Sequence, residues 1–158
     1  ELGGSHYYAL NGALGASVPK VRPIEARKTM DVVYALIQGG AVSAVHDCSE
    51  GGWAVAAAEM AFAGGLGMDL SVRVVPGQEL RTDDLLFSES ASRFVVTVPA
   101  EMEARFLGGL AVLGMSAHRK LGVVTDDGQF TVRVSDGRLR VSAEVETLKR
   151  AWQSTLAW

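Results

Sequence analysis

The sequence predicts an α+β fold in which helices pack on a mixed sheet, and three observations lead to this class. Apolar residues recur at helical spacing in 24–38 and 144–158, and the Ala-rich stretch 52–63, almost wholly small and apolar, is also predicted to be a helix. Short alternating or apolar runs typical of strands lie between them, and Asp-Gly pairs typical of hairpins come late in the chain. Helices mixed with strands, followed by hairpin signals, favour an α+β sandwich over a purely parallel sheet.

The expected elements follow in order along the chain. Residues 1–23 are rich in Gly, Ser and Pro and are predicted to be a lead-in or linker segment, so that the domain spans residues 24–158. Glycine pairs end the first two helices, at Gly39-Gly40 and Gly64-Gly65. The other expected elements are strands at 42–45, 68–74, 93–98 and 119–124, a loop or short helix at 76–84, a helix at 99–113, and hairpins turning at Asp127-Gly128 and Asp136-Gly137.

Composition limits the partners that we expect. The net charge is −3, with 15 basic and 18 acidic residues interspersed, which disfavours a nucleic-acid-binding face. The one cysteine excludes an intramolecular disulfide and favours a reducing, cytoplasmic compartment. No apolar run reaches the roughly 18 residues of a membrane span, so no membrane partner is expected. Because the chain starts without Met or a signal peptide, we expect it to be a fragment of a longer protein.

The first polar cluster is His46-Asp-Cys-Ser-Glu-Gly-Gly52, which lies between a short strand and a helix. Free N–H groups and the helix dipole favour an anion at such a junction. One interpretation is a phosphate-binding turn made by Ser49, Gly51 and Gly52, with Asp47 lining the ligand groove. The other is a tight turn in which Ser49 caps the helix and the glycines allow close packing.

The second polar cluster is Leu86-Phe-Ser-Glu-Ser-Ala-Ser-Arg93, directly before the strongest strand signal. It is either a solvated loop in which Arg93 pairs with Glu89, or part of a ligand groove. In the second interpretation Glu89 and Ser90 face the ligand and Arg93 orients Glu89, since Arg holds carboxylates through paired hydrogen bonds. A third, weaker cluster, Leu2-Gly-Gly-Ser5 followed by His6, is either a mobile linker or a loop that folds over a ligand.

Other reactive residues have simpler interpretations. Cys48 lacks a recognisable His and Asn partner pattern, so we do not expect a nucleophile. The three histidines lack metal-ligand spacing, and Asp126-Asp-Gly128 lacks the later ligands of a calcium loop. We therefore predict neither a catalytic residue nor a metal ligand in this chain.

The two larger clusters together resemble a known family. Val45-His-Asp-Cys-Ser-Glu-Gly-Gly-Trp-Ala-Val-Ala56 and Leu86-Phe-Ser-Glu-Ser-Ala-Ser-Arg-Phe-Val-Val96 are similar to phosphoribosylformylglycinamidine synthase of purine biosynthesis, in its second AIR-synthase-like C-terminal domain. Leu2-Gly-Gly-Ser5 resembles the motif that opens this domain, and Leu148-Lys-Arg-Ala-Trp152 resembles the C-terminus of the small-subunit form. The resemblance covers nearly the whole chain.

The resemblance implies a three-layer α/β/α sandwich with a mixed sheet. It implies an enzyme that uses ATP and Mg²⁺ to convert formylglycinamide ribonucleotide and glutamine-derived ammonia to formylglycinamidine ribonucleotide. The family's catalytic histidine and main magnesium ligands lie in N-terminal domains, so the isolated fragment is expected to be inactive. The implied partners are the N-terminal domains of the same chain, a glutaminase subunit and a small bridging subunit. Exposed apolar faces could instead pair the fragment into a homodimer.

Two alternatives follow from the same resemblance. The chain could be the C-terminal domain of another ATP-dependent enzyme of the superfamily, of the hydrogenase-maturation or selenophosphate type, or a non-catalytic assembly module. Even within the synthase, the site in this half of the enzyme is expected to be auxiliary rather than catalytic.

Overall fold

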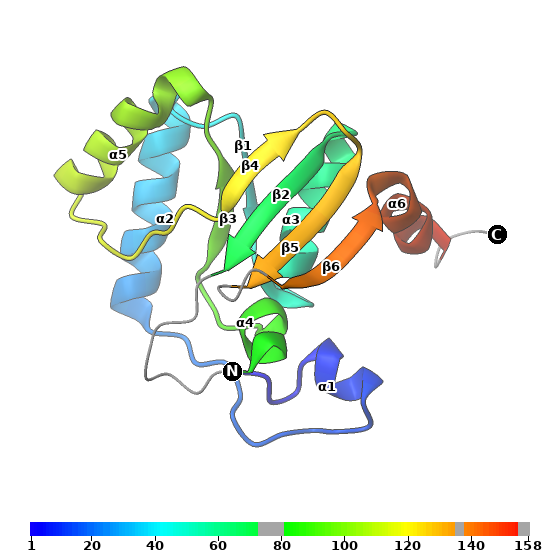
Figure 1. Ribbon diagram of the computed structural model, residues 1–158. Helices are drawn as coiled ribbons and strands as arrows, with labels where there is room; N and C mark the ends of the chain where they lie inside the picture. Colours follow the sequence, from blue (N-terminus) through cyan, green and yellow to red (C-terminus); the bar gives the residue numbers. More distant parts are fainter. Residues whose placement is uncertain (73–80, 135–137, 155–158) are drawn as a thin grey trace. The chain divides into compact units, whose positions relative to one another are not determined.

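The computed structural model describes residues 1–72, 81–134 and 138–154, which form two compact units (Figure 1). Unit 1 comprises Glu1–Ala56 and Phe87–Arg119, and unit 2 comprises Ala57–Leu86 and Lys120–Trp158. Helix α3 (Gly52–Gly64) contributes its first turn to unit 1 and its remainder to unit 2. None of the described helices is both long enough and apolar enough to span a bilayer.

Unit 1 is a helical pair with a two-stranded antiparallel sheet. Val32 and Leu36 of one long helix pack with Leu110 of the other, and Ala41 completes this small core. The first long helix ends at Gln38, before the glycine pair, as predicted. The elements of this unit are α1 (His6–Leu10), α2 (Pro23–Gln38), β1 (Ala44–Asp47), β3 (Phe94–Thr97), the 3₁₀ turn η1 (Ala100–Met102) and α5 (Glu103–Val112).

Unit 2 contains a four-stranded sheet in the order β4-β2-β5-β6 (Figure 1). The central pair β2 and β5 is parallel, whereas β4 and β6 run antiparallel to their neighbours, so the sheet is mixed. The predicted α+β class with a mixed sheet is therefore confirmed. The elements are β2 (Gly67–Val72), α4 (Thr82–Phe87, of which the last residue belongs to unit 1), β4 (Gly122–Thr125), β5 (Gln129–Val134), β6 (Leu139–Glu144) and α6 (Val145–Ser154).

One face of the central strand pair forms the core of unit 2. The parallel register places alternate residues of β2 and β5 side by side, because every second side chain points to the same face. The six residues paired in this way are each at most 6% exposed, so the apolar positions of the alternating sequence pattern are the buried ones. The pairs are Met68 with Phe130, Leu70 with Val132, and Val72 with Val134.

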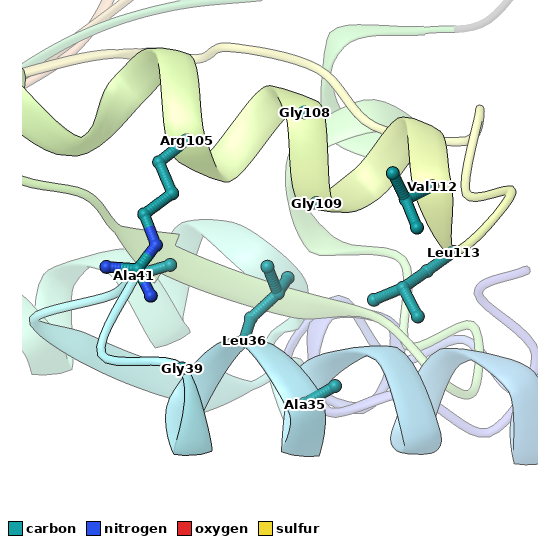
Figure 2. A pocket seen from close by; sticks show the side chains of 9 residues that line it. All are labelled: Ala35, Leu36, Gly39, Ala41, Arg105, Gly108, Gly109, Val112 and Leu113. Atoms are coloured by element: carbon teal, nitrogen blue, oxygen red, sulfur yellow. The ribbon is translucent and has the colours of Figure 1, made fainter.

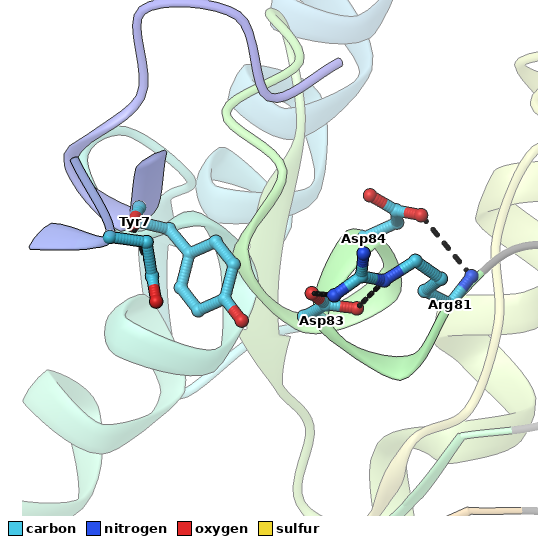
Figure 3. Close-up of polar contacts among 5 residues, drawn as sticks. Tyr7, Arg81, Asp83 and Asp84 are labelled. Carbon is cyan, nitrogen blue, oxygen red and sulfur yellow. Dashed lines mark hydrogen bonds and ion pairs between the residues drawn. The ribbon is translucent and has the colours of Figure 1, made fainter. Parts of the chain in front are cut away.

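Polar contacts hold the beginning of α4 (Figure 3). The Arg81 guanidinium donates to both carboxylate oxygens of Asp83, at 3.0 and 2.6 Å. The Arg81 backbone N–H donates to Asp84 Oδ2 at 3.2 Å, which supplies an acceptor at the first turn. This helix occupies part of the segment 76–84, for which a loop or short helix was predicted; residues 73–80 lie outside the described part of the chain.

Trp152 joins α6 to α3 within unit 2. Its indole N–H donates to Glu59 Oε1 at 3.1 Å, and its ring centroid lies 5.7 Å from that of Phe62. The aromatic residue thus uses both its apolar body and its polar tip. The predicted closing helix is confirmed over Val145–Ser154, and residues 155–158 lie outside the described chain.

The first strand is displaced from its predicted position. The apolar run predicted a strand at 42–45, but β1 spans Ala44–Asp47. Pairing with β3 continues through the polar residues, with His46 opposite Val95 and Asp47 opposite Phe94. Val42 instead packs against the core of the two helices. The neighbouring strand, not the apolar run, thus decides where β1 lies.

The predicted hairpin at Asp127-Gly128 is wrong. The turn exists, and Asp127 Oδ1 accepts hydrogen bonds from Thr125 Oγ1 at 2.7 Å and from Gln129 N at 3.0 Å. However, β4 and β5 do not pair with one another, because β2 lies between them. Local turn chemistry is the same in both arrangements and does not distinguish them. The second predicted hairpin fits the antiparallel pairing of β5 and β6, although its turn, Asp136-Gly137, lies outside the described residues.

Residues 1–23 have a defined structure. They contain α1 and a loop in which Gly3 N donates to Ser17 O at 2.8 Å and Gly4 N donates to Leu14 O at 2.7 Å. Leu2 is buried. The segment belongs to unit 1 by its contacts, whereas the domain boundary between residues 23 and 24 stays a prediction.

Candidate functional site

The carboxylate of Glu89 joins the three polar clusters that the sequence singled out. Its Oε1 atom accepts a hydrogen bond from the backbone N–H of Gly51 at 2.9 Å and another from the N–H of His6 at 3.0 Å. All three residues belong to unit 1. The structure therefore brings together one residue from each cluster, although Glu89 is separated from its two partners by 38 and 83 positions in sequence.

Two N–H groups of the turn that begins α3, those of Gly51 and Gly52, already have internal acceptors. Gly51 and Gly52 adopt φ angles of +74° and +67°, which L side chains rarely adopt. Gly51 N–H binds Glu89, and Gly52 N–H donates to Ser49 O at 3.1 Å. The predicted phosphate position at Gly51 thus holds the protein's own carboxylate. The assignment of Ser49, Gly51 and Gly52 to phosphate binding stays a prediction.

The side chain of Ser49 makes a local contact. Its hydroxyl donates a short hydrogen bond to Asp47 Oδ2. This bond lowers the pKa of the Asp47 carboxyl below its ordinary value, with smaller contributions from the Asp47 backbone N–H and the neighbouring His46. Because the hydroxyl is engaged in this way, Asp47 and Ser49 form a polar pair directly before the glycines.

Arg93 holds the backbone on both sides of Glu89. Its Nε donates to Ser90 O at 3.0 Å, and its Nη2 makes a short hydrogen bond to Ser88 O. The sequence predicted that Arg93 pairs with or orients the Glu89 carboxylate. In the structure its guanidinium binds the flanking carbonyls instead, and so fixes the loop that carries Glu89. Ser92, in the same loop, has a φ of 62°, which is uncommon for a residue other than glycine.

The beginning of the chain is attached to the same loop by further contacts. Glu89 N donates to Glu1 O at 3.1 Å. The rings of Tyr7 and Phe87 are stacked, with centroids 4.9 Å apart and an interplanar angle of 6°. Ser5 is buried and caps α1, accepting from Tyr8 N at 3.2 Å.

Sequence reasoning missed the roles of His6 and Tyr7. The His6 backbone N–H, rather than the imidazole, binds Glu89. Almost every residue type has a backbone N–H, so the sequence does not indicate this bond. The ring stacking of Tyr7 on Phe87 joins residues distant in sequence. The one available signal was the position of both residues directly after the Leu2-Gly-Gly-Ser5 motif.

Two hollows lie within unit 1. A polar one of about 370 Å³ includes the predicted groove residue Ser90, together with Ser92 and the charged residues Lys20 and Arg22. A mostly apolar one of about 370 Å³ lies between α2 and α5 (Figure 2). Figure 2 shows Arg105 of α5 extending across it toward Ala41.

Neither a metal cluster nor a reactive thiol emerges from the described residues. In residues 1–72, 81–134 and 138–154, no three or more His, Cys, Asp or Glu side chains are grouped to hold a metal ion. Burial raises the pKa of the Cys48 thiol, which disfavours the thiolate form needed of a nucleophile.

Replacing Ser49 tests the Asp47–Ser49 pair. Ser49→Ala should raise the Asp47 pKa toward its ordinary value near 3.8, because the strongest hydrogen bond to the carboxylate is lost. A lowered folded-state pKa stabilises the fold above the unfolded-state pKa, and this stabilisation is lost as pH falls through the folded-state value. The stability difference between the wild type and Ser49→Ala should therefore persist at neutral pH and disappear in acid.

The measurement is an NMR pH titration of the Asp47 side-chain carboxyl carbon, combined with urea unfolding at neutral and acidic pH. Ser43→Ala is the matched control, since Ser43 lies before the same strand and is exposed. An Asp47 pKa that is equal in the wild type and Ser49→Ala would contradict the assigned hydrogen bond.

The fold and site define an α+β domain whose polar turns meet at a strand-to-helix junction. The sequence pattern of the family described as "AIR synthase related protein, C-terminal domain" matches residues 1–135. The chain therefore belongs to this family.

Curated relatives with a more specific name match nearly the whole chain. The phosphoribosylformylglycinamidine synthase subunit PurL of Deinococcus radiodurans is 37% identical over 157 residues, covering 99% of this chain and 20% of the relative. The same-named subunit of Moorella thermoacetica is 36% identical, with the same coverage. The chain thus spans about a fifth of the length of the curated relatives that it matches.

Solved structures confirm the fold. Phosphoribosylformylglycinamidine synthase II of Thermotoga maritima matches with a TM-score of 0.69 at 22% identity, covering 84% of this chain and 22% of that one. A hydrogenase maturation protein, HypE, in complex with ATP matches with a TM-score of 0.55 at 22% identity, covering 76% of this chain and 41% of that one. At these identities the likeness speaks for the fold alone.

Proposed function

We propose that this chain is the second-half C-terminal domain of a phosphoribosylformylglycinamidine synthase. The observation that carries the proposal is the 37% identity, over 99% of the chain, to a subunit of that name. The parent enzyme would convert formylglycinamide ribonucleotide, ATP and glutamine-derived ammonia to formylglycinamidine ribonucleotide. Thermotoga maritima structures described as complexes with formylglycinamide ribonucleotide (FGAR) and with ATP support this substrate set.

Within that enzyme, the turn before α3 would bind an anionic group such as a phosphate. The Gly51 N–H already binds a carboxylate, which supports its assignment to an anion. Asp47, Glu89 and Ser90 would line the ligand groove, with Arg93 fixing the loop. ATP would supply the phosphoryl group that activates the substrate amide oxygen. We assign the enzyme's Mg²⁺ to no residue of the described chain, which offers no suitable ligand cluster.

The partners follow from the same assignment. The N-terminal domains of the same chain, a glutaminase subunit and a small bridging subunit would complete a cytoplasmic complex. A structure described as PurLQS from Thermotoga maritima supports such an assembly. Copurification under conditions that preserve nucleotide should recover all three subunits, and recovery of the synthetase alone would count against the complex. In the absence of these partners, the chain could form a homodimer through its exposed apolar residues.

The experiment that tests the function is an assay of ATP- and ammonia-dependent amidine formation. The full-length protein that contains this chain should turn over formylglycinamide ribonucleotide, whereas residues 1–158 alone should not. Inactivity of the full-length protein would overturn the assignment. Turnover by residues 1–158 would overturn the auxiliary role of this domain.

A hydrogenase-maturation type of enzyme is the second candidate, because the chain shares its fold with HypE in complex with ATP. The same assay separates the two. Nucleotide hydrolysis by the full-length protein without any amidine formation would favour this second class.

A further inference from the structure

We infer that the Glu89 side chain is a displaceable internal anion: it attaches residues 1–10 to the turn before α3 and must leave that turn when a phosphate-class anion binds there. This inference rests on the proposed function of the turn. Its structural basis is a single oxygen, Glu89 Oε1, which accepts from both Gly51 N and His6 N. One atom therefore controls two attachments at once.

An external anion and the Glu89 carboxylate cannot both occupy the Gly51 N–H. A backbone N–H donates one good hydrogen bond, and two anions brought within contact distance repel one another. The Gly52 N–H is not a ready alternative donor for the external anion, since it already donates to Ser49 O. Binding at the turn therefore requires the Glu89 side chain to move away.

The loop that carries Glu89 does not depend on its carboxylate. Arg93 binds the carbonyl oxygens of Ser88 and Ser90, one on each side of Glu89. These bonds persist whatever rotamer Glu89 adopts. The Glu89 side chain can thus leave Gly51 while its backbone stays in place.

Departure of the carboxylate also weakens the attachment of the chain's first residues. His6 N–H loses its acceptor at the same moment, because both bonds use the same oxygen. The fold of the first residues does not depend on Glu89, since Gly3 and Gly4 are hydrogen-bonded to Ser17 and Leu14, further along the same loop. What remains between residues 1–10 and the loop is the Glu89 N to Glu1 O bond, the hydrogen bond from the Glu1 amino group to Ser90 Oγ at 3.4 Å, and the stacking of Tyr7 on Phe87. Anion binding at the turn should therefore loosen residues 1–10.

The test is hydrogen exchange read by mass spectrometry on the full-length protein, titrated with inorganic phosphate. Two peptides report the two ends of the contact, residues 1–10 and residues 46–56. In the wild type, phosphate should slow exchange in 46–56 and speed exchange in 1–10. Without phosphate, Glu89→Ala should already speed exchange in 1–10.

The direction of the change in phosphate affinity shows whether Glu89 competes with phosphate for the turn or merely holds the turn in place. Glu89→Ala should lower the phosphate concentration for half-protection of 46–56 by about tenfold, equivalent to about 1.4 kcal/mol. Glu89→Gln keeps an acceptor oxygen but removes the charge, so it should lower the same phosphate concentration by a smaller factor. It also serves as the second variant if Glu89→Ala perturbs folding. Glu50→Gln is the matched charge control for phosphate affinity: the exposed Glu50 lies 4.0 Å from the His6 ring, so the substitution changes the charge beside the turn and this one ion-pair contact, but neither hydrogen bond of Glu89.

The outcomes are distinct. Equal or weaker phosphate protection in Glu89→Ala than in the wild type overturns the competition and leaves the anion site standing. An equal increase in phosphate affinity in Glu50→Gln and Glu89→Gln would mean that the loss of any nearby negative charge has this effect, and would also overturn the inference. Absence of protection of 46–56 in the wild type and in every variant overturns the anion site itself, and the inference with it.

Discussion

Gly67→Val is expected to destabilise unit 2 by about 3 kcal/mol or more, from overpacking and lost hydrogen bonds. A Cβ at this position would lie 2.6 Å from Gln129 O and closer still to Thr125 Oγ1 and Asp127 Oδ1. The connection from β4 to β5 passes over the start of β2 at this point, so no side chain fits beneath it. Such a loss is a large part of the roughly 5–15 kcal/mol that stabilises a typical protein.

Urea unfolding followed by circular dichroism measures the effect. Gly64→Ala is the matched control, because a Cβ at Gly64, the last residue of α3, meets no atom within 4 Å. It should be neutral or stabilising by up to about 1 kcal/mol, as expected for Gly to Ala in a helix. Wild-type stability in Gly67→Val would contradict the strand order β4-β2-β5.

Gly51→Val is expected to weaken phosphate or nucleotide binding by more than the roughly 1 kcal/mol of one neutral hydrogen bond. Gly51 has a φ of +74°, and a Cβ there would lie 2.9 Å from Val55 Cβ and closer to Val55 Cγ2. The turn must therefore move, which displaces the Gly51 N–H that now points at Glu89. The Gly52 N–H, one residue further along the same turn, should be displaced with it.

Calorimetry on the full-length protein measures this effect, after circular dichroism has verified the fold. Gly40→Ala is the control: Gly40 has a φ of +64°, but a Cβ there meets no atom within 4 Å. It carries the conformational cost of a left-handed residue, about 1–2 kcal/mol, without the clash, and should leave ligand affinity unchanged. Unchanged affinity in Gly51→Val would make this motif a packing turn.

Prediction from the sequence succeeded where the signal is local. The helices α2 and α3 end at the glycine pairs that follow their periodic runs, and the alternation in β2 is matched by alternate burial. The residues of each polar cluster were also singled out. Each of these signals spans only a few residues, so neighbouring side chains determine it without knowledge of distant partners.

Prediction failed where a partner distant in sequence decides. A strand was correctly predicted near 42–45, but β1 begins two residues later because its pairing with β3 sets its position. Asp127-Gly128 does form a turn, but the strands that it connects are separated by β2. Arg93 is a different case, because its partners are local: it was expected to pair with or orient Glu89, but its guanidinium binds the carbonyls of Ser88 and Ser90.

The sequence by itself determined the α+β class, the helix ends and the residues from which the candidate site is built. Only the tertiary structure decided the strand order, the register of β1 and the partners of Glu89. The physical reason is separation along the chain: Glu89 meets its two N–H donors across 38 and 83 residues. Helix spacing and turn residues act within a few positions, whereas a contact of that range depends on the packing of the whole unit.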